Sequence, residues 1–88
     1  MGSEVYSKPA ASYMHGVCVE ESGSVRAFAE RARHSGDALI GFRTVDGSVV
    51  VNPDPDEHIT LTASADSSAP NAVTQLVVVS ANAHCCSE

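Results

Sequence analysis

The sequence predicts an α+β domain in which one helix packs on a small, mainly antiparallel β-sheet. Three observations lead to this fold class. Apolar residues recur at helical spacing in a single segment, an Asp-Gly pair separates two short apolar runs, and a continuous run of mostly β-branched residues lies near the C-terminus. The expected order is two strands, one helix and four further strands, with no internal repeat.

The N-terminal segment is expected to contribute two short extended pieces. Residues 4–8 alternate modestly between two faces and end at Pro9, which places a strand at the edge of a sheet, where it can pair with a second subunit. Residues 10–16 are expected to form an irregular turn. Residues 17–19 are the second extended piece.

The helix is expected over residues 25–35. Residues at positions i, i+3, i+4 and i+7 of this segment form one apolar stripe: Val25, Phe28, Ala29 and Ala32. Ser24 is the preferred N-cap, because its hydroxyl can accept a backbone N–H of the first turn, and Ser22 is the competing cap. Gly36 suits the position that follows a helix C-terminus.

A β-hairpin is expected after the helix. The apolar runs 38–42 and 49–51 are separated by a turn that contains Asp46 and Gly47, two residues that tolerate positive φ. The second run stops at the sequence Asn-Pro-Asp-Pro of residues 52–55. Two prolines remove two backbone donors, so the strand cannot continue through them.

The remaining chain is expected to hold two strands and a loop. Residues 58–62 alternate and predict a strand, residues 63–72 are small and polar and predict a loop, and residues 75–80 predict a buried strand. Residues 1–80 therefore form one domain. Residues 81–88 show no periodicity and are expected to be a flexible tail.

Composition limits the class of protein. The chain has 88 residues and a net charge of −6, from eleven acidic and five basic residues, which argues against nucleic-acid binding. No apolar stretch is long enough to insert in a membrane, and the first residues lack the features of a signal peptide. With three cysteines, an odd number, these features predict a cytoplasmic protein.

Several segments point to a known family. The chain contains, in this order, Ala38-Leu39-Ile40-Gly41-Phe42-Arg43, Gly47-Ser48-Val49-Val50-Val51-Asn52-Pro53 and Leu76-Val77-Val78-Val79. In order and spacing they resemble the RCK C-terminal domain, also called TrkA-C, which is the ligand-sensing module of potassium channels and transporters. The front half, with Ser3-Glu4-Val5-Tyr6, Lys8-Pro9-Ala10 and Gly36, looks like the Castor/Pollux type of ion channel.

The resemblance covers roughly residues 3–80, with one local departure. The family usually places Gly-Asp before its last strand, whereas Gln75 stands there in this chain, after a longer segment at 63–74. The family's nucleotide-binding domain and membrane pore are not part of this sequence.

The resemblance implies a cytosolic regulatory domain rather than an enzyme. Such domains form dimers, bind a small effector or an ion between subunits, and transmit the change to a channel or transporter subunit, which would place them at the inner face of the membrane. Cyclic di-AMP and divalent cations are the effectors known in the family. The residues themselves also argue against catalysis, because they contain no nucleophile elbow, phosphate-binding loop or zinc-protease motif.

A ligand site is expected around the hairpin. Arg43 can clamp a phosphate or carboxylate with two hydrogen bonds, and the neighbouring aromatic Phe42 suits a nucleotide base. Tyr6 can stack on a base, and Asn52 lies at the exit of the hairpin. The simpler interpretation is a surface arginine at a strand end and a tyrosine that packs at a subunit seam.

Two groups of residues have the chemistry of metal ligands. Asp54, Asp56 and Glu57 place spaced carboxylates in a turn, which suits a hard divalent cation, although a solvated acidic turn is the simpler interpretation. The other group is a possible soft-metal set, for which a tail with incidental thiols and a small core cysteine are the alternatives: Cys18, His84, Cys85 and Cys86.

Two functions remain beside the regulatory domain. One is a stand-alone protein-interaction module that docks a partner through an exposed sheet edge. The other is a small metal-handling protein that uses the C-terminal histidine and cysteines.

Overall fold

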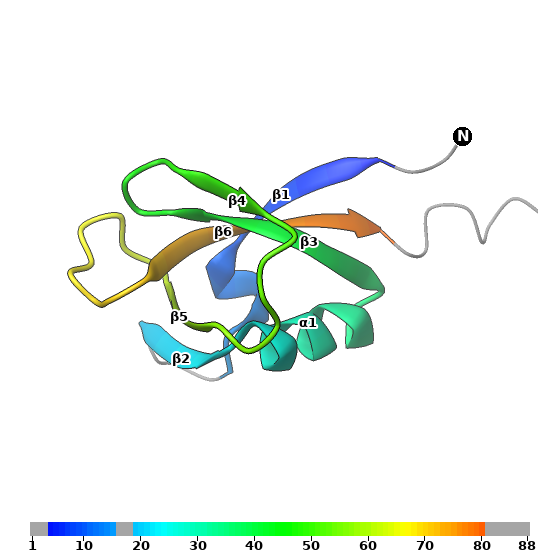
Figure 1. Ribbon diagram of the computed structural model, residues 1–88, viewed down its shortest axis with the longest axis horizontal. Helices are drawn as coiled ribbons and strands as arrows, with labels where there is room; N and C mark the ends of the chain where they lie inside the picture. Colours follow the sequence, from blue (N-terminus) through cyan, green and yellow to red (C-terminus); the bar gives the residue numbers. More distant parts are fainter. Residues whose placement is uncertain (1–3, 16–18, 81–88) are drawn as a thin grey trace, which may run out of the picture.

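The computed structural model describes residues 4–15 and 19–80, which form a six-stranded mixed sheet and one α-helix (Figure 1). The predicted α+β class is confirmed. The elements, in chain order, are β1 (Val5–Pro9), the 3₁₀-helix η1 (Ala10–Tyr13), β2 (Glu20–Ser24), α1 (Val25–His34), β3 (Asp37–Thr44), β4 (Val49–Val51), β5 (His58–Thr62) and β6 (Ala72–Ser80).

Strand β6 is the centre of the sheet. Strand β3 pairs antiparallel along one of its edges, from Val73 to Ser80. The other edge is shared end to end, because β5 pairs parallel at Ala72 and Val73, and β1 pairs antiparallel from Gln75 to Val79. Strand β4 extends the sheet beyond β3, and β2 extends it beyond β5. The sheet is thus antiparallel except at the β5–β6 pair, which the sequence did not reveal.

Helix α1 is bounded by Ser24 at its N-terminus and by Gly36 just beyond its C-terminus. The hydroxyl of Ser24 accepts the backbone N–H of Ala27 at 3.1 Å, so Ser24 is the N-cap. The helix ends at His34, one residue before the predicted end, and Gly36 follows with φ of 87°. This left-handed conformation is the one that glycine adopts without strain, which is why the chain can turn there into β3.

The predicted hairpin is confirmed, with a longer loop than an Asp-Gly pair alone indicates. Thr44 donates its N–H to the carbonyl of Ser48 at 2.9 Å, and Gly47 donates its N–H to Thr44 at 3.0 Å. Of the two turn residues only Gly47 has positive φ, at 93°, while the Asp46 carboxylate accepts the N–H of Ser48. This geometry matches a three-residue hairpin loop that closes with a glycine in the left-handed region.

Two strands differ from the sequence prediction. Residues 20–24, expected only to lead into the helix, form β2 and pair along β5. Strand β2 lies at an edge of the sheet and carries polar side chains. One of them bonds across to β5, where the Ser22 and Thr60 hydroxyls lie 2.8 Å apart. Strand β6 begins at Ala72 instead of residue 75. The extended piece predicted at 17–19 falls mostly outside the described residues, and the predicted tail at 81–88 falls entirely outside them.

The core lies between α1, η1 and one face of the sheet. Figure 1 shows α1 beneath the strands β3, β4, β6 and β1. Strands β2 and β5 lie at the lower left of this view, to the left of the helix. The buried apolar residues come from all of these layers: Ala10, Tyr13, Val25, Phe28, Ala32, Phe42, Ile59, Leu61, Val73, Leu76 and Val78. Two aromatic residues of this core, Phe28 on α1 and Phe42 on β3, are each at most 2% exposed. Val25, Phe28 and Ala32 of the predicted helix stripe therefore face the core, and Ala29 is half-buried at its margin.

Candidate functional site

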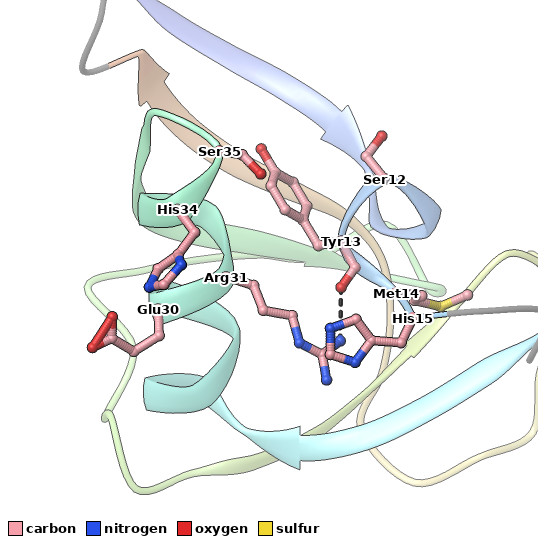
Figure 2. Close-up of a pocket in the computed structure, with 8 residues that line it drawn as sticks. All are labelled: Ser12, Tyr13, Met14, His15, Glu30, Arg31, His34 and Ser35. Atoms are coloured by element: carbon pink, nitrogen blue, oxygen red, sulfur yellow. Dashed lines mark hydrogen bonds between the residues drawn. The ribbon is translucent and has the colours of Figure 1, made fainter.

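A hollow of about 400 Å³ opens between η1 and the C-terminal half of α1 (Figure 2). Two short segments line it. The η1 wall contributes Ser12, Tyr13, Met14 and His15, and the helix wall contributes Glu30, Arg31, His34 and Ser35.

The sequence positions both walls. Ala10 and Tyr13 are buried and fasten η1 to the core, so the intervening Ser12 stays exposed at the rim. On the helix, Glu30 and His34 are four residues apart and therefore lie on one face, outside the apolar stripe. The hollow is thus formed where the polar flank of α1 meets the end of η1.

Arg31 connects the two walls. Its Nη1 donates to the backbone carbonyl of Tyr13 at 2.8 Å, and its Nη2 donates to the carboxylate of Glu21 on β2. The same carboxylate accepts the backbone N–H of His15 at 2.8 Å. The guanidinium also lies 5.1 Å from the centre of the Phe28 ring, within the range of a cation–π contact. These contacts hold the exit of η1 against the helix.

The surroundings of Glu21 strongly favour the ionised form of its carboxyl group over the protonated form. The hydrogen bond from Arg31 and the backbone N–H of His15 lower the pKa of Glu21 from 4.5 to about 2. Burial acts in the opposite direction and is outweighed. Glu21 is therefore ionised throughout the neutral and mildly acidic range.

We expect Glu21→Gln to lower the free energy of unfolding at pH 7 by about 2 kcal/mol, because the charged hydrogen bonds to Arg31 are lost. The folded-state pKa is lowered, so this stabilisation is fully present above the unfolded pKa of 4.5 and disappears as the pH falls towards 2. Urea unfolding of both proteins across this range measures it. Glu30→Gln, at an exposed carboxylate on α1, is the control with a small effect. Equal losses at pH 7 and pH 2 for Glu21→Gln would contradict the assignment.

A second polar network fixes the other end of Tyr13. The Tyr13 hydroxyl donates to Asp37 Oδ2 at 2.6 Å, and Lys8 Nζ donates to the same oxygen at 2.9 Å. Burial alone would raise the pKa of Asp37, but the hydrogen bonds from Tyr13 and Lys8 outweigh it and the pKa is lowered. Burial and the neighbouring carboxylate raise the pKa of the Tyr13 hydroxyl. The hydroxyl therefore stays a proton donor.

Sequence reasoning missed both networks. Lys8 and Asp37 are 29 residues apart, Tyr13 and Asp37 are 24 apart, and Glu21 and Arg31 are 10 apart. An acid directly after the helix-ending Gly36 was the one available signal, because a polar residue that starts a core strand must find partners if it is buried.

The sheet also has an open face, opposite to α1. Residues in register on neighbouring strands point to the same side of a sheet. The rows of this face are Val5–Val79–Ala38, Ser7–Val77–Gly41–Val51 and Pro9–Gln75–Arg43–Val49. None of the described elements covers it, and Val5, Val49 and Val51 are 61%, 47% and 63% exposed. We use "open face" below for its six apolar side chains: Val5, Ala38, Val49, Val51, Val77 and Val79.

The predicted ligand residues do not converge within one copy. Phe42 is 2% exposed and packs in the core, so its assignment as a ligand contact was wrong. Arg43 lies at one end of the open face and donates to the Gly47 carbonyl at 3.2 Å. Tyr6 pairs with Val78, three positions along β6 from the partner of Arg43, and its hydroxyl donates to Glu4.

Asn52 lies apart from these residues. It has φ of 52° and donates its N–H to the Ile40 carbonyl at 2.9 Å, which ends the hairpin. Its side chain borders a second hollow of about 320 Å³, lined by Val25, Arg26, Ala29, Leu39, Ile40, Asn52, Pro53 and Pro55.

The acidic turn fastens the start of α1. The Asp56 carboxylate accepts Arg26 Nη2 at 2.6 Å, the Asp54 carboxylate accepts the N–H of Asp56 at 3.0 Å, and the Glu57 carbonyl accepts the N–H of Val25 at 2.8 Å. Within 4–15 and 19–80, no three histidine, cysteine or carboxylate side chains come together as metal ligands. The predicted cation site at Asp54, Asp56 and Glu57 therefore has no support in the geometry.

The soft-metal set lies outside the described residues, since Cys18, His84, Cys85 and Cys86 all fall there. In the part of the chain that the structure describes, no helix has the length and apolar character needed to cross a membrane.

Comparison of the chain with known protein families, with curated proteins and with solved structures finds no match. The resemblance to the RCK C-terminal domain therefore remains a prediction that rests on the quoted segments.

Proposed function

We propose that the chain is a non-catalytic regulatory domain that works as a homodimer through its open face. The resemblance to the RCK C-terminal domain further implies that it senses a small effector for a potassium channel or transporter. The observation that carries the proposal is the open face, an apolar surface that no described element covers. The largest apolar patch on a typical monomeric domain measures about 300–600 Å² and is often functional.

The occupant that fits this face best is a second copy. At ~4.8 Å spacing, about five residues each of β1, β6 and β3 and the three residues of β4 span roughly 300 Å² of sheet. Two-fold symmetry places the same patch on both sides, so an apolar face is complementary to itself. The chain carries a net charge of −6, yet among the described residues of this face Arg43 is the one charged side chain. Two copies can therefore meet here without bringing carboxylates together.

The position of Arg43 selects between the expected effectors. It lies at the end of the open face, so a seam between two copies would present Arg43 from each of them. Two guanidinium groups favour an anion such as cyclic di-AMP over a divalent cation. A ligand held across the seam would bias the orientation of the two copies, which is the coupling that a regulatory domain needs.

We expect sedimentation to show a weak dimer whose dissociation constant lies in the range of about 10–100 μM, because the buried area is small. The double variant Val51→Lys/Val77→Lys, in one row of the face, should weaken dimerisation at least about tenfold, since it buries charge. Val19→Lys is the matched control, because Val19 is 69% exposed and lies outside the open face. A wild-type chain that stays monomeric at about 1 mM would contradict the proposal.

Effector binding has a separate measurement. A ligand that binds only the folded state raises stability by about 2.7 kcal/mol at a hundredfold excess over its dissociation constant. Cyclic di-AMP should raise the melting temperature of the wild type, and Arg43→Gln should remove this rise. A rise with divalent cations instead, unaffected by Arg43→Gln, would contradict the anionic effector.

The second candidate function is a module that docks a partner strand. Strand β4 has only three residues, pairs on one side with β3, and exposes Val49 and Val51. An extended segment of another protein can pair with such an edge. A monomeric wild type that still binds extended peptides along β4 would favour this function.

A further inference from the structure

The hollow between η1 and α1 gathers basic groups of an acidic chain. The chain has five lysine and arginine residues and four histidines, and three of these nine side chains line the hollow: His15, Arg31 and His34. The one lining carboxylate, Glu30, forms an ion pair with Arg33. Figure 2 shows the Arg31 side chain extending from α1 towards His15 on the opposite wall, with His34 and Glu30 further along the helix side. Positively charged or donor groups therefore approach the hollow from both walls.

Arg31 keeps donors for a ligand. A guanidinium has five N–H groups, and the contacts to Tyr13 and Glu21 account for two of them. Its side chain is 24% exposed and lines the hollow, so part of the guanidinium can be reached by a ligand. The hydroxyls of Ser12 and Ser35 add two further donors at the rim.

Two features oppose an anion here. The ionised Glu21 carboxylate pairs with Arg31 and lies 3.8 Å from Nδ1 of His15, and the hollow lies near the negative end of the helix. That end is well satisfied within the chain. Ser35 donates its N–H to the carbonyls of Arg31 and Ala32 at 3.2 and 3.0 Å, and Gly36 donates to that of Arg33 at 2.9 Å. Basic side chains in the last turn offset what remains of the helix dipole.

The hollow has an apolar part and a fixed shape. The half-buried Met14 supplies apolar surface beside the donors, whereas Tyr13 is 4% exposed and packs in the core. Its volume of about 400 Å³ lies within the range of small-molecule sites and exceeds what a lone phosphate ion fills. Tyr13 is held at its hydroxyl by Asp37 and at its carbonyl by Arg31, so the wall is formed before any ligand arrives.

We infer that this hollow is a binding site for a small organic anion, a carboxylate or a phosphate monoester. Its charged group would accept hydrogen bonds from Arg31, His15 and His34, and its body would lie against Met14. The site lies within a single copy, away from the open face, and goes beyond the proposed effector site at the dimer seam.

Phenyl phosphate is a suitable probe, because it combines the anionic group with an apolar body. In titrations of the full ¹⁵N-labelled chain, the amide signals of residues 12–15 and 30–35 should shift and saturate with a dissociation constant of about 1 mM or below. Inorganic phosphate should bind more weakly, and the neutral analogue benzyl alcohol should bind at least about tenfold more weakly. Equal shifts with benzyl alcohol would overturn the anion site.

The variants leave Arg31 in place, since it supports the fold. His15→Gln/His34→Gln should weaken phenyl phosphate binding about tenfold, because it removes two donors that can carry charge. His58→Gln, at an exposed histidine outside the hollow, is the matched control and should bind as the wild type does. Unchanged binding in the double variant, or no saturable shift up to about 50 mM, would overturn the site. Repeating the titration with Val51→Lys/Val77→Lys separates this result from dimerisation, because the hollow should bind the probe equally in that variant.

Discussion

Asp37→Ala is expected to lower the free energy of unfolding by about 3 kcal/mol, one of the two largest effects that we predict. The Asp37 side chain is 3% exposed and accepts hydrogen bonds from both Tyr13 and Lys8. Its removal leaves the buried Tyr13 hydroxyl without an acceptor, which costs about 1–3 kcal/mol. It also leaves the Lys8 ammonium unpaired, although that side chain is 39% exposed and can turn to water. The loss in unfolding free energy would exceed about 3 kcal/mol only if Lys8 were fully buried, because its charge could then not be solvated.

The two residues that donate to Asp37, Tyr13 and Lys8, should contribute unequally to the free energy of unfolding. Tyr13→Phe removes one donor and keeps Asp37 paired with Lys8, so we expect a loss of about 1–1.5 kcal/mol. Lys8→Met removes a half-exposed charge, and its loss should stay near or below about 1 kcal/mol. Urea unfolding of the single variants and of the pair Tyr13→Phe/Lys8→Met measures their coupling. A double-variant loss larger than the sum of the single losses is expected, because Asp37 is then buried without a partner.

The pH dependence of Asp37 has a definite sign. Its folded-state pKa is lowered, so its stabilisation is present above the ordinary carboxyl range and is lost as the pH falls below it. The difference in unfolding free energy between the wild type and Asp37→Ala should therefore shrink in acid. Asp66→Ala, at an exposed acid in the loop before β6, is the control with no such change. A loss below about 1 kcal/mol for Asp37→Ala at neutral pH would show that the network contributes little.

The elements that the sequence predicted well are those with local signals. The helix depends on the spacing of Val25, Phe28 and Ala32 and on capping by Ser24, all within one segment. The hairpin depends on a turn that contains Gly47. In each case the residues that decide the structure are neighbours in the chain, so periodicity and turn chemistry suffice.

The elements that the sequence did not reveal depend on distant partners. Strand β2 has no apolar alternation, and it is a strand because β5 lies beside it from Thr62 to His58. The parallel contact of β5 with β6 is likewise decided by tertiary packing. The polar networks of Asp37 and Glu21 join segments up to 29 residues apart, and the sequence does not show which acid meets which base.

The assignment of Phe42 as a ligand contact could have been avoided from the sequence. Adjacent residues of a strand point to opposite faces, so Phe42 and Arg43 cannot both face one ligand from a regular strand. An aromatic residue in a segment with one buried face belongs to the core, and its charged neighbour then belongs to the other side. The structure has this arrangement, with Phe42 in the core and Arg43 on the open face.

Gly41 was part of the family resemblance, and the structure gives a physical reason for a glycine there. A Cβ atom at this position would lie 2.4 Å from the backbone carbonyl oxygen of Val50 and 3.3 Å from the Cα of Val51. The φ of Gly41 is not positive, so close approach of β4 and not backbone conformation excludes a side chain. The pairing of β3 with β6 is irregular between Leu39 and Gly41, which accompanies this close approach.

We expect Gly41→Ala to lower the free energy of unfolding by about 3 kcal/mol, at the upper end of overpacking effects, because the clashing atom is backbone and cannot rotate away. Strand β4 must move off β3, so the amide of Asn52, which donates to the Ile40 carbonyl, should lose protection against hydrogen exchange. Urea unfolding and amide exchange measure the two effects.

Gly23→Ala separates a backbone clash from ordinary crowding. A Cβ at Gly23 would lie 3.2 Å from the Phe28 ring, which can yield by a few tenths of an ångström, so the expected loss is about 1 kcal/mol and the Asn52 amide should stay protected. Equal losses in the two variants would mean that β4 adjusts as easily as a side chain does. A larger loss in Gly41→Ala, with exchange confined to β4 and its exit, would instead show that this glycine sets how closely β4 approaches β3, and with it the position of Val49 and Val51 on the open face.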